Sequence, residues 1–339
     1  MPDWNSFLIE QGFNQTGNLD LAQLNYAADA TYVMPLSQGL IEIKGPDSAK
    51  FLQGQVTCDV RELANNKTQL GAQCNIKGRM LLCFRALQTD AERILLRVHH
   101  GLVANGLSSL GKYIVFSKAK LADVTPAYRC IGIAGPQAAQ ILKDVLAIDI
   151  AENGNWQAAS NHIIIRIDEQ RFECWIAADE AQTFWNQVRA HANLADHNYW
   201  NLLNIQAGIG DITPETFETF TPQAINFQLV NGINFRKGCY TGQEIVARLH
   251  YRGTLKRHMY RFGFSIADET LPLPGSELKN ADDKTVGEVI STAYVNASSG
   301  ELLASVVDDE RVAIYLTNNP QKLSLLALPY AIPTANEED

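Results

Sequence analysis

Two segments that share one pattern constrain the fold of this 339-residue chain more than any other feature. Residues 40–52, "LIEIKGPDSAKFL", and residues 130–142, "CIGIAGPQAAQIL", each run from a strand-like alternation through Gly-Pro into the helical spacing A-x-x-L. Gly-Pro ends a strand, and apolar residues at i and i+3 share one face of a helix. The match predicts two related α+β units packed side by side and suggests that the second is a duplicate of the first.

Further strand and helix patterns follow each unit, and the pattern changes near Leu255. We expect a strand at 93–100, a helix at 101–114, a hairpin at 161–178 and a helix at 181–192. Beyond Leu255 come five strand-like runs separated by Gly, Pro and Asp or Asn turns. They predict a small all-β domain, a barrel, after the two α+β units. The predicted fold class is therefore α+β.

The length and composition indicate a globular chain with more than one core. At 339 residues, with 46% apolar and 19% charged residues, we expect two or three domains. No apolar run approaches the roughly 20 residues that span a bilayer, and we expect no signal peptide because basic and apolar leader regions are missing. Six cysteines without a C-x-x-C pair argue against a disulfide framework or a zinc site. We expect a reducing cytoplasm and no membrane contact.

The stretch at 235–248, "FRKGCYTGQEIVAR", carries the signals of a helix start. Thr241 and Glu244 stand at the S/T-x-x-E spacing of a capping box, which predicts Thr241 as the N-cap and Gly242 as the first helical residue. Cys239 would then lie two residues before the cap, near the positive end of the helix dipole.

Two interpretations of Cys239 stay open. The helix dipole together with the neighbouring Arg236 and Lys237 favours the thiolate over the thiol, which is how reactive cysteines arise. Alternatively, Cys239 is a small buried apolar residue, as free cysteines often are. The local context favours the reactive thiol.

Charge is concentrated in the same region. The chain carries a net charge of −9, yet residues 235–261 hold seven Lys or Arg residues against the single acidic Glu244. This local charge of +6 predicts a basic patch that receives phosphate, carboxylate or an RNA backbone. A solvated face of long side chains explains the same run equally well.

The octapeptide "KGCYTGQE", with "FTPQAINF" before it and "ARLHYRGTLKR" after it, closely resembles the signature of the YgfZ proteins. These are folate-binding relatives of the aminomethyltransferase, or T-protein, of the glycine cleavage system. Further segments match in the family's order, and the resemblance covers roughly residues 33–330. They are "GLIEIKGPDSAKFLQGQVTCDV" (39–60), "CNIKGRM" (74–80), "LGKYIVFSK" (110–118), "LLNIQAGIGDI" (202–212) and "VGEVIS" (286–291).

The resemblance implies three interleaved domains arranged as a ring around a folate site. We assign residues 1–120 to a first α+β domain, 121–253 to a second that carries the octapeptide, and 254–335 to the barrel. It also implies tetrahydrofolate as the cofactor and a role in supporting the assembly or repair of iron–sulfur enzymes, including those that thiolate tRNA. It defines no reaction. Our first hypothesis joins this role to the local chemistry and takes Cys239 as the reactive residue.

Three folate contacts are implied where the family's folate site aligns with Trp200, Gln206 and Gln38. The ring of Trp200 could stack on the pterin or aminobenzoyl ring, although a core tryptophan is a competing interpretation. Gln206 stands where the family has an acidic pterin-binding residue. An amide accepts through its oxygen alone, so we expect pterin binding to weaken by about 1–3 kcal/mol. Gln38 aligns with a position that is aromatic in close relatives.

Polar residues in two other segments are further candidates. Asn75 and Lys77 lie in the loop that matches a C1-transfer segment of the aminomethyltransferases, and a simple turn explains them equally well. Arg252, in the basic stretch, could hold the glutamate tail of folate or make weak contact with tRNA.

One departure argues against aminomethyl transfer. The aminomethyltransferases carry a pair of aspartates where this chain has Leu82 and Cys83, which leaves no general acid or base at that location. Two other functions stay open: a folate-dependent one-carbon transferase, and a tRNA-binding or protein-binding module that uses the basic stretch.

Overall fold

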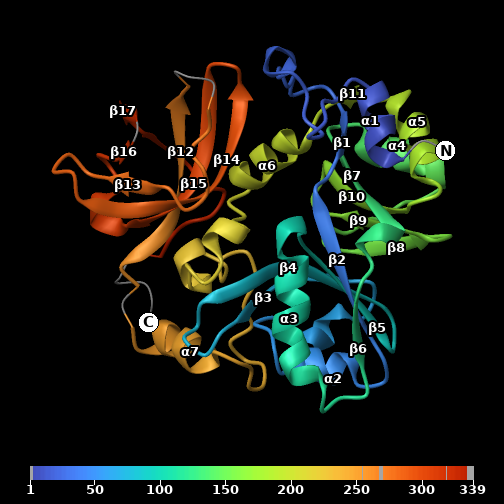
Figure 1. Cartoon of the computed structure of the whole chain (residues 1–339), viewed down its shortest axis with the longest axis horizontal. Helices are drawn as coiled ribbons and strands as arrows, with labels where there is room; N and C mark the ends of the chain where they lie inside the picture. The colour runs from blue at the N-terminus through green and yellow to red at the C-terminus, as the bar shows by residue number, and fades with distance from the viewer. Residues whose placement is uncertain (1–2, 254, 267–269, 318, 334–339) are drawn as a thin grey trace.

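The computed structural model describes residues 3–253, 255–266, 270–317 and 319–333. Its strands form three sheets, and the units built on them surround the centre of the molecule (Figure 1). Short 3-10 turns lie between the larger elements, at Leu21–Gln23, Val60–Leu63, His100–Leu102, Thr125–Ala127, Pro214–Thr216, Pro222–Ile225 and Asp308–Glu310.

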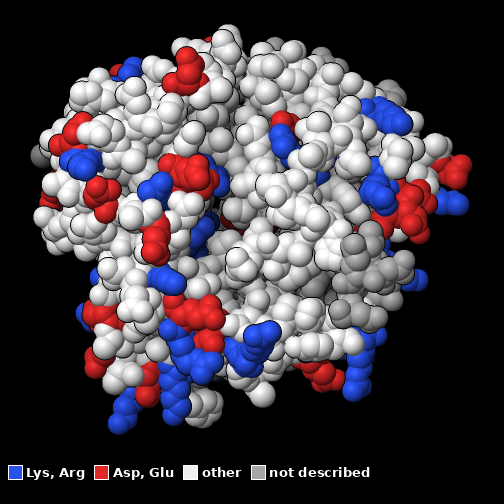
Figure 2. Space-filling model, turned by 180° about the vertical axis from the view of Figure 1, so that it is seen from behind, with Lys and Arg blue, Asp and Glu red and all other residues white. Residues whose placement is uncertain are grey.

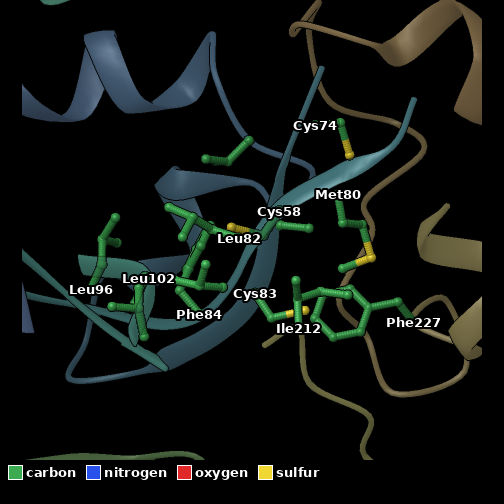
Figure 3. Close-up of a cluster of buried hydrophobic side chains, with 14 of the residues drawn as sticks. Cys58, Cys74, Met80, Leu82, Cys83, Phe84, Leu96, Leu102, Ile212 and Phe227 are labelled. Atoms are coloured by element: carbon green, nitrogen blue, oxygen red, sulfur yellow. The ribbon is translucent and has the colours of Figure 1, made fainter. Parts of the chain in front are cut away.

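The first unit is a five-stranded sheet with two helices. Its order is β3 (Thr68–Cys74), β4 (Met80–Asp90), β5 (Arg93–His99), β2 (Gln38–Lys44) and β6 (Lys120–Asp123). The helices are α2 (Ser48–Gln53) and α3 (Val103–Ile114). Strand β5 confirms the predicted strand at 93–100, and α3 confirms most of the predicted helix at 101–114. Figure 3 shows part of its apolar core, in which Leu82, Phe84 and Leu96 come together.

The second unit is a six-stranded sheet with three helices. Its order is β11 (Asn193–Leu194), β1 (Tyr32–Pro35), β7 (Tyr128–Ala134), β10 (Arg171–Ala177), β9 (His162–Arg166) and β8 (Trp156–Ala159). The helices are α1 (Trp4–Glu10), α4 (Ala138–Leu146) and α5 (Ala181–Arg189). The antiparallel pairing of β9 with β10 confirms the hairpin, and α5 confirms the last predicted helix.

The repeated pattern of the sequence is confirmed as a repeated structure. In the first unit β2 turns at Gly45 into α2, and in the second β7 turns at Gly135 into α4. Both glycines have left-handed backbone angles, with φ of +139° and +132°. A Cβ on either would overlap a backbone carbonyl oxygen, that of Lys118 or of Ala30. Each unit therefore needs glycine at the same turn for the same reason.

The predicted boundary at residue 120 does not follow the sheets. Strand β1 pairs with β7 and β11 of the second unit, and Phe7 and Leu8 of α1 pack in the core of the second unit. The chain therefore enters the second unit first, crosses to the first at β2 and returns at β7, which is the interleaving that the resemblance implied.

The third unit is a nearly closed seven-stranded barrel, drawn in orange and red in Figure 1. Its order is β17 (Asn319–Lys322), β16 (Tyr315–Leu316), β13 (Glu277–Lys279), β14 (Thr285–Asn296), β15 (Ser299–Val307), β12 (Arg257–Ser265) and β18 (Ser324–Leu326). This confirms the strand-rich C-terminal domain. Helix α6 (His197–Gln206) joins the barrel to the second unit, because Asn198 exchanges two hydrogen bonds with the backbone of Tyr294.

Candidate functional site

A cavity of about 990 Å³ lies where the first two units meet the segment that leads to α7 (Gln243–Tyr251). Its walls come from 58–70 and Arg85 of the first unit, from 152–155 and 167–171 of the second, and from 230–236. Figure 2 shows a hollow near the centre of the rear face, with both cationic and acidic side chains around it. A cavity of this volume accommodates an organic ligand of several rings.

The carboxylates around this cavity already have partners. Asp59 pairs with Arg61 and Asp168 pairs with Arg171, each at 2.5 Å between nitrogen and oxygen. Hydrogen bonding to Arg61 lowers the pKa of Asp59 to about 2. Glu62 accepts from Asn234 Nδ2 at 2.8 Å, and Glu152 accepts from Asn155 Nδ2 at 3.4 Å.

Three cations of the cavity wall lack such a partner. Lys67, Arg85 and Arg236 form no ion pair with any carboxylate in the part of the chain that the structure describes. Burial lowers the pKa of Arg85 to about 10, so its guanidinium stays charged at neutral pH. Asp59 and Asp168 are paired with arginines, whereas Glu62 and Glu152 accept only from uncharged amides and keep their charge. Three unpaired cations against these two carboxylates leave a field that weakly favours an anion.

An aromatic group borders the cavity beside these cations. The rings of Phe235 and His250 are stacked, with centroids 3.7 Å apart and planes 12° apart. Tyr251 next to them is 65% exposed. Flat conjugated ligands stack on such surfaces.

Helix α7 begins one residue later than predicted. Gly242 is the N-cap, with φ of +83°, and no side chain caps the helix, so the predicted capping box of Thr241 and Glu244 is wrong. The physical reason is the close passage of Gly242 over the first unit, where a Cβ would overlap the carbonyl oxygen of Asn75. Glycine tolerates both the left-handed backbone and the close approach to Asn75. Because glycine has no side chain, the N-cap position offers no capping hydrogen bond.

The loop before α7 is held to the first unit by a buried lysine. Lys237 Nζ donates to the carbonyl oxygens of Gln53, Val56 and Cys58 at 2.8, 2.6 and 2.7 Å. It also lies 5.1 Å from the ring centroid of Tyr240. Burial lowers the pKa of Lys237 to about 8. The three donors of the ammonium are therefore directed at backbone carbonyls, and the cysteine-bearing loop is fixed in place.

Cys239 is exposed, so the interpretation of it as a buried apolar residue is wrong. The other five cysteines are buried, and burial raises the pKa of each of their thiols: Cys58, Cys74, Cys83, Cys130 and Cys174. Cys239 thus combines an accessible thiol with a backbone that Lys237 anchors.

The two predicted folate residues of α6 face different surroundings. Trp200 is only 2% exposed and packs in the core between the units, with Arg171 Cζ 5.7 Å from its ring centroid. It also borders a small cavity that adjoins the central one. Gln206 lines a surface recess with Tyr199 and Leu203 that adjoins the central cavity, because Asp168 and Arg171 belong to the walls of both.

The remaining predicted folate residues lie outside the wall of the central cavity. Gln38 is buried at the start of β2, opposite His99, and its Oε1 has no partner among the described residues. Asn75 accepts from the backbone of Lys77 and Arg79 and donates to Glu218, so its amide forms a turn. Lys77 is exposed.

The basic stretch does not form one continuous patch. Lys237 is buried, and Arg261 pairs with Glu301 at 2.7 Å within the barrel. Arg252 is exposed at the C-terminal end of α7, next to the aromatic border of the cavity. Arg236, Arg248 and Lys256 are also exposed.

Sequence reasoning missed Arg85 and Glu173, which the fold brings to the centre. Each is a charged residue at a buried position of an otherwise apolar strand, "LLCFRAL" and "RFECWIA". That contrast is the signal that could have found them, because unpaired charges are rarely buried.

The positions that hold aspartates in the aminomethyltransferases are apolar here. Leu82 is fully buried and Cys83 is 6% exposed, both within the cluster shown in Figure 3. A carboxylate from another element, Asp211, lies beside Cys83 in the small cavity, and burial raises its pKa.

No helix in the described ranges is long and apolar enough to cross a membrane. Within the same ranges, no group of three or more His, Cys, Asp and Glu side chains is arranged to hold a metal ion.

Comparison with known proteins gives consistent matches. The model of the GCVT N-terminal domain family matches residues 36–230. A "tRNA-modifying protein YgfZ" from Photobacterium profundum is 34% identical over 304 residues, covering 87% of this chain and 89% of that protein. One from Yersinia pseudotuberculosis is 33% identical over 301 residues, covering 86% and 90%. The glycine cleavage system aminomethyltransferase T from Bartonella henselae shares the fold, with a TM-score of 0.71, 17% identity and coverage of 89% and 86%.

Proposed function

This chain belongs to the YgfZ family of GCVT-domain proteins, and from that membership we propose that it binds a folate and serves tRNA modification. The folate is tetrahydrofolate, and the ligand site is the central cavity. We place the protein in the cytoplasm.

One observation supports the ligand most directly: the cavity wall keeps three unpaired cations, whereas two of its four carboxylates are ion-paired with arginines. Folate joins flat pterin and aminobenzoyl rings to a glutamate that carries two negative charges. Lys67 and Arg236 suit the glutamate, and Arg252 lies next to the same border. Phe235, His250 and Tyr251 suit a ring.

Cys239 is the reactive residue of this proposal. It is an exposed thiol on a loop that a buried ammonium anchors to the wall of the cavity. In this role it supports the assembly or repair of iron–sulfur enzymes, with tRNA-thiolating enzymes as partners. Leu82 and Cys83 supply no carboxylate where the aminomethyltransferases have aspartates, which argues against aminomethyl transfer.

Anaerobic calorimetric titration with tetrahydrofolate tests the ligand. We expect saturable binding in the micromolar range, weakened at least tenfold by Arg236→Ala because a charge-assisted contact is lost. Lys77→Ala, an exposed lysine outside the cavity wall, is the control. No binding at millimolar tetrahydrofolate would exclude a folate site.

Activity of Cys239 is tested by complementation of a strain that lacks the gene, with thiolated tRNA as the readout. We expect Cys239→Ala to abolish complementation without lowering the unfolding temperature. Cys239 would be merely structural if the variant complemented fully.

A second function, direct binding of tRNA, is favoured by the exposed Arg248, Arg252 and Lys256 near Tyr251. Such binding would weaken steeply with salt and fall on charge reversal at Arg252 and Lys256. Binding of tRNA without any affinity for folate would favour this function over the first.

A further inference from the structure

The central cavity has a small annex of about 30 Å³. The two share Leu70, Arg85, Ile167 and Ile209 as walls, so the annex adjoins the larger space. Its far walls carry polar and aromatic side chains of both units, namely Arg97, Glu173, Trp200, Asn204 and Asp211. A volume of this size holds a water molecule or the edge of a ring, and a whole bicyclic ring would remain in the main cavity.

Glu173 brings an unused acceptor to the annex. Its side chain is only 1% exposed, on β10. One carboxylate oxygen, Oε1, accepts from Trp175 Nε1 at 2.8 Å and lies 3.2 Å from Arg97 Nε. The other, Oε2, has no hydrogen-bond partner among the residues that the structure describes. A buried carboxylate oxygen without a donor costs free energy, and a ligand N–H would remove that cost.

Arg85 brings an unused donor to the boundary between the cavities. It is 7% exposed, on β4, and its Nη1 donates to Thr68 Oγ1 at 2.9 Å. Its Nε has no acceptor within the described ranges. Two other polar groups of the annex are engaged: Asn204 Oδ1 accepts from Arg171 at 3.0 Å, and Asp211 accepts from the backbone of Ile212 at 2.8 Å. Arg97 Nε, 3.2 Å from Glu173 Oε1, also has no hydrogen-bond acceptor within the described ranges.

A free carboxylate oxygen and a free guanidinium N–H in the walls of one small cavity match one kind of ring edge. A 2-aminopyrimidin-4-one carries a ring N–H and an amino group, which donate, next to a carbonyl oxygen, which accepts. We propose that Glu173 and Arg85 together recognise such an edge where the annex adjoins the central cavity, with Glu173 accepting from its nitrogens and Arg85 donating to its carbonyl.

This inference rests on the proposed folate site and assigns the residues that read its pterin. Gln206 stands where the family has its acidic pterin residue, but it lines the adjoining recess and belongs to the wall of neither the central cavity nor the annex. Glu173 supplies from β10 the carboxylate that α6 lacks. Guanine carries the same edge as pterin, so the test includes both.

The experiment compares Glu173→Gln with Glu42→Gln, which removes a partly buried carboxylate that pairs with Arg93 and lies outside the walls of both cavities. Each is titrated calorimetrically with tetrahydrofolate, with p-aminobenzoylglutamate, which lacks the pterin, and with guanosine. We expect Glu173→Gln to weaken tetrahydrofolate 10- to 100-fold and to leave p-aminobenzoylglutamate unchanged. Glu42→Gln should weaken neither by more than about threefold, because its carboxylate lies outside both cavities.

Each outcome separates this inference from the proposed function. If wild type binds tetrahydrofolate and Glu173→Gln binds it equally well, the inference is overturned and the folate site stands. If the wild type binds guanosine but not tetrahydrofolate, and Glu173→Gln no longer binds guanosine, recognition of the 2-aminopyrimidin-4-one edge is confirmed and the folate proposal is overturned. Should Glu173→Gln fold poorly, Arg85→Lys provides the second test, because lysine keeps the charge but loses the planar donor. Unchanged selectivity for tetrahydrofolate over p-aminobenzoylglutamate in a folded Arg85→Lys would also overturn the inference.

Discussion

Lys237 Nζ donates to the carbonyl oxygen of Cys58 at 2.7 Å, across 179 residues of sequence. The contact joins the loop of the exposed cysteine to a residue of the central cavity wall. The position of Cys239 relative to the cavity therefore depends on a buried side chain two residues away.

Replacement of Lys237 by Met should lower the free energy of unfolding by about 2–4 kcal/mol, because three backbone carbonyls lose their donor. Urea denaturation followed by circular dichroism measures the change. The exposed Lys77→Met is the matched control and should change stability by less than about 0.5 kcal/mol. Equal effects of the two variants would mean that the buried ammonium does not hold the loop.

Cys239 should be the thiol that reacts in the native protein, because the other five are buried. Brief treatment with iodoacetamide, followed by mass spectrometry, should label Cys239 at least tenfold more than any other cysteine, since burial limits access and raises thiol pKa. In Cys239→Ser the native protein should take up almost no label, and denaturation should expose five thiols. Prominent labelling of Cys58 or Cys83 under native conditions would contradict this arrangement.

The sequence predicted the α+β units and the barrel because their signals are local. Alternation marked β5 and β10, and Gly-Pro marked the turns after β2 and β7. The interleaving of β1 into the second sheet depends on long-range pairing, and it was reached only through the family resemblance.

The candidate site was predicted less completely, for physical reasons. Cys239 stood out because its neighbours in sequence are its neighbours in space. The N-cap was placed wrongly because the decisive contact of Gly242 is with Asn75, far away in sequence. Arg85 and Glu173 come from different units, and only the assembled fold brings them to one cavity.

The paired glycine turns should be intolerant of a side chain. Gly135→Ala should lower the free energy of unfolding by at least about 2 kcal/mol, since φ is +132° and a Cβ overlaps the carbonyl of Ala30. Thermal and urea unfolding measure the loss. Gly111→Ala, within α3 and with nothing within 4 Å of its added Cβ, is the control and should stabilise by up to about 1 kcal/mol. A neutral Gly135→Ala would contradict the strained turn.

His197, at the start of α6, should make stability fall in mild acid. Burial first, and then the neighbouring charges of His99 and Arg97, lower its pKa from 6.5 to about 4. The unfolded chain therefore binds a proton that the folded chain refuses between those pH values, so stability falls as pH decreases through the window. Relative to His197→Gln, wild type should lose at most about 3 kcal/mol between pH 7 and pH 4, measured by urea denaturation at each pH. Parallel stability curves for the two proteins would show that His197 takes up its proton as easily in the folded state as in the unfolded chain.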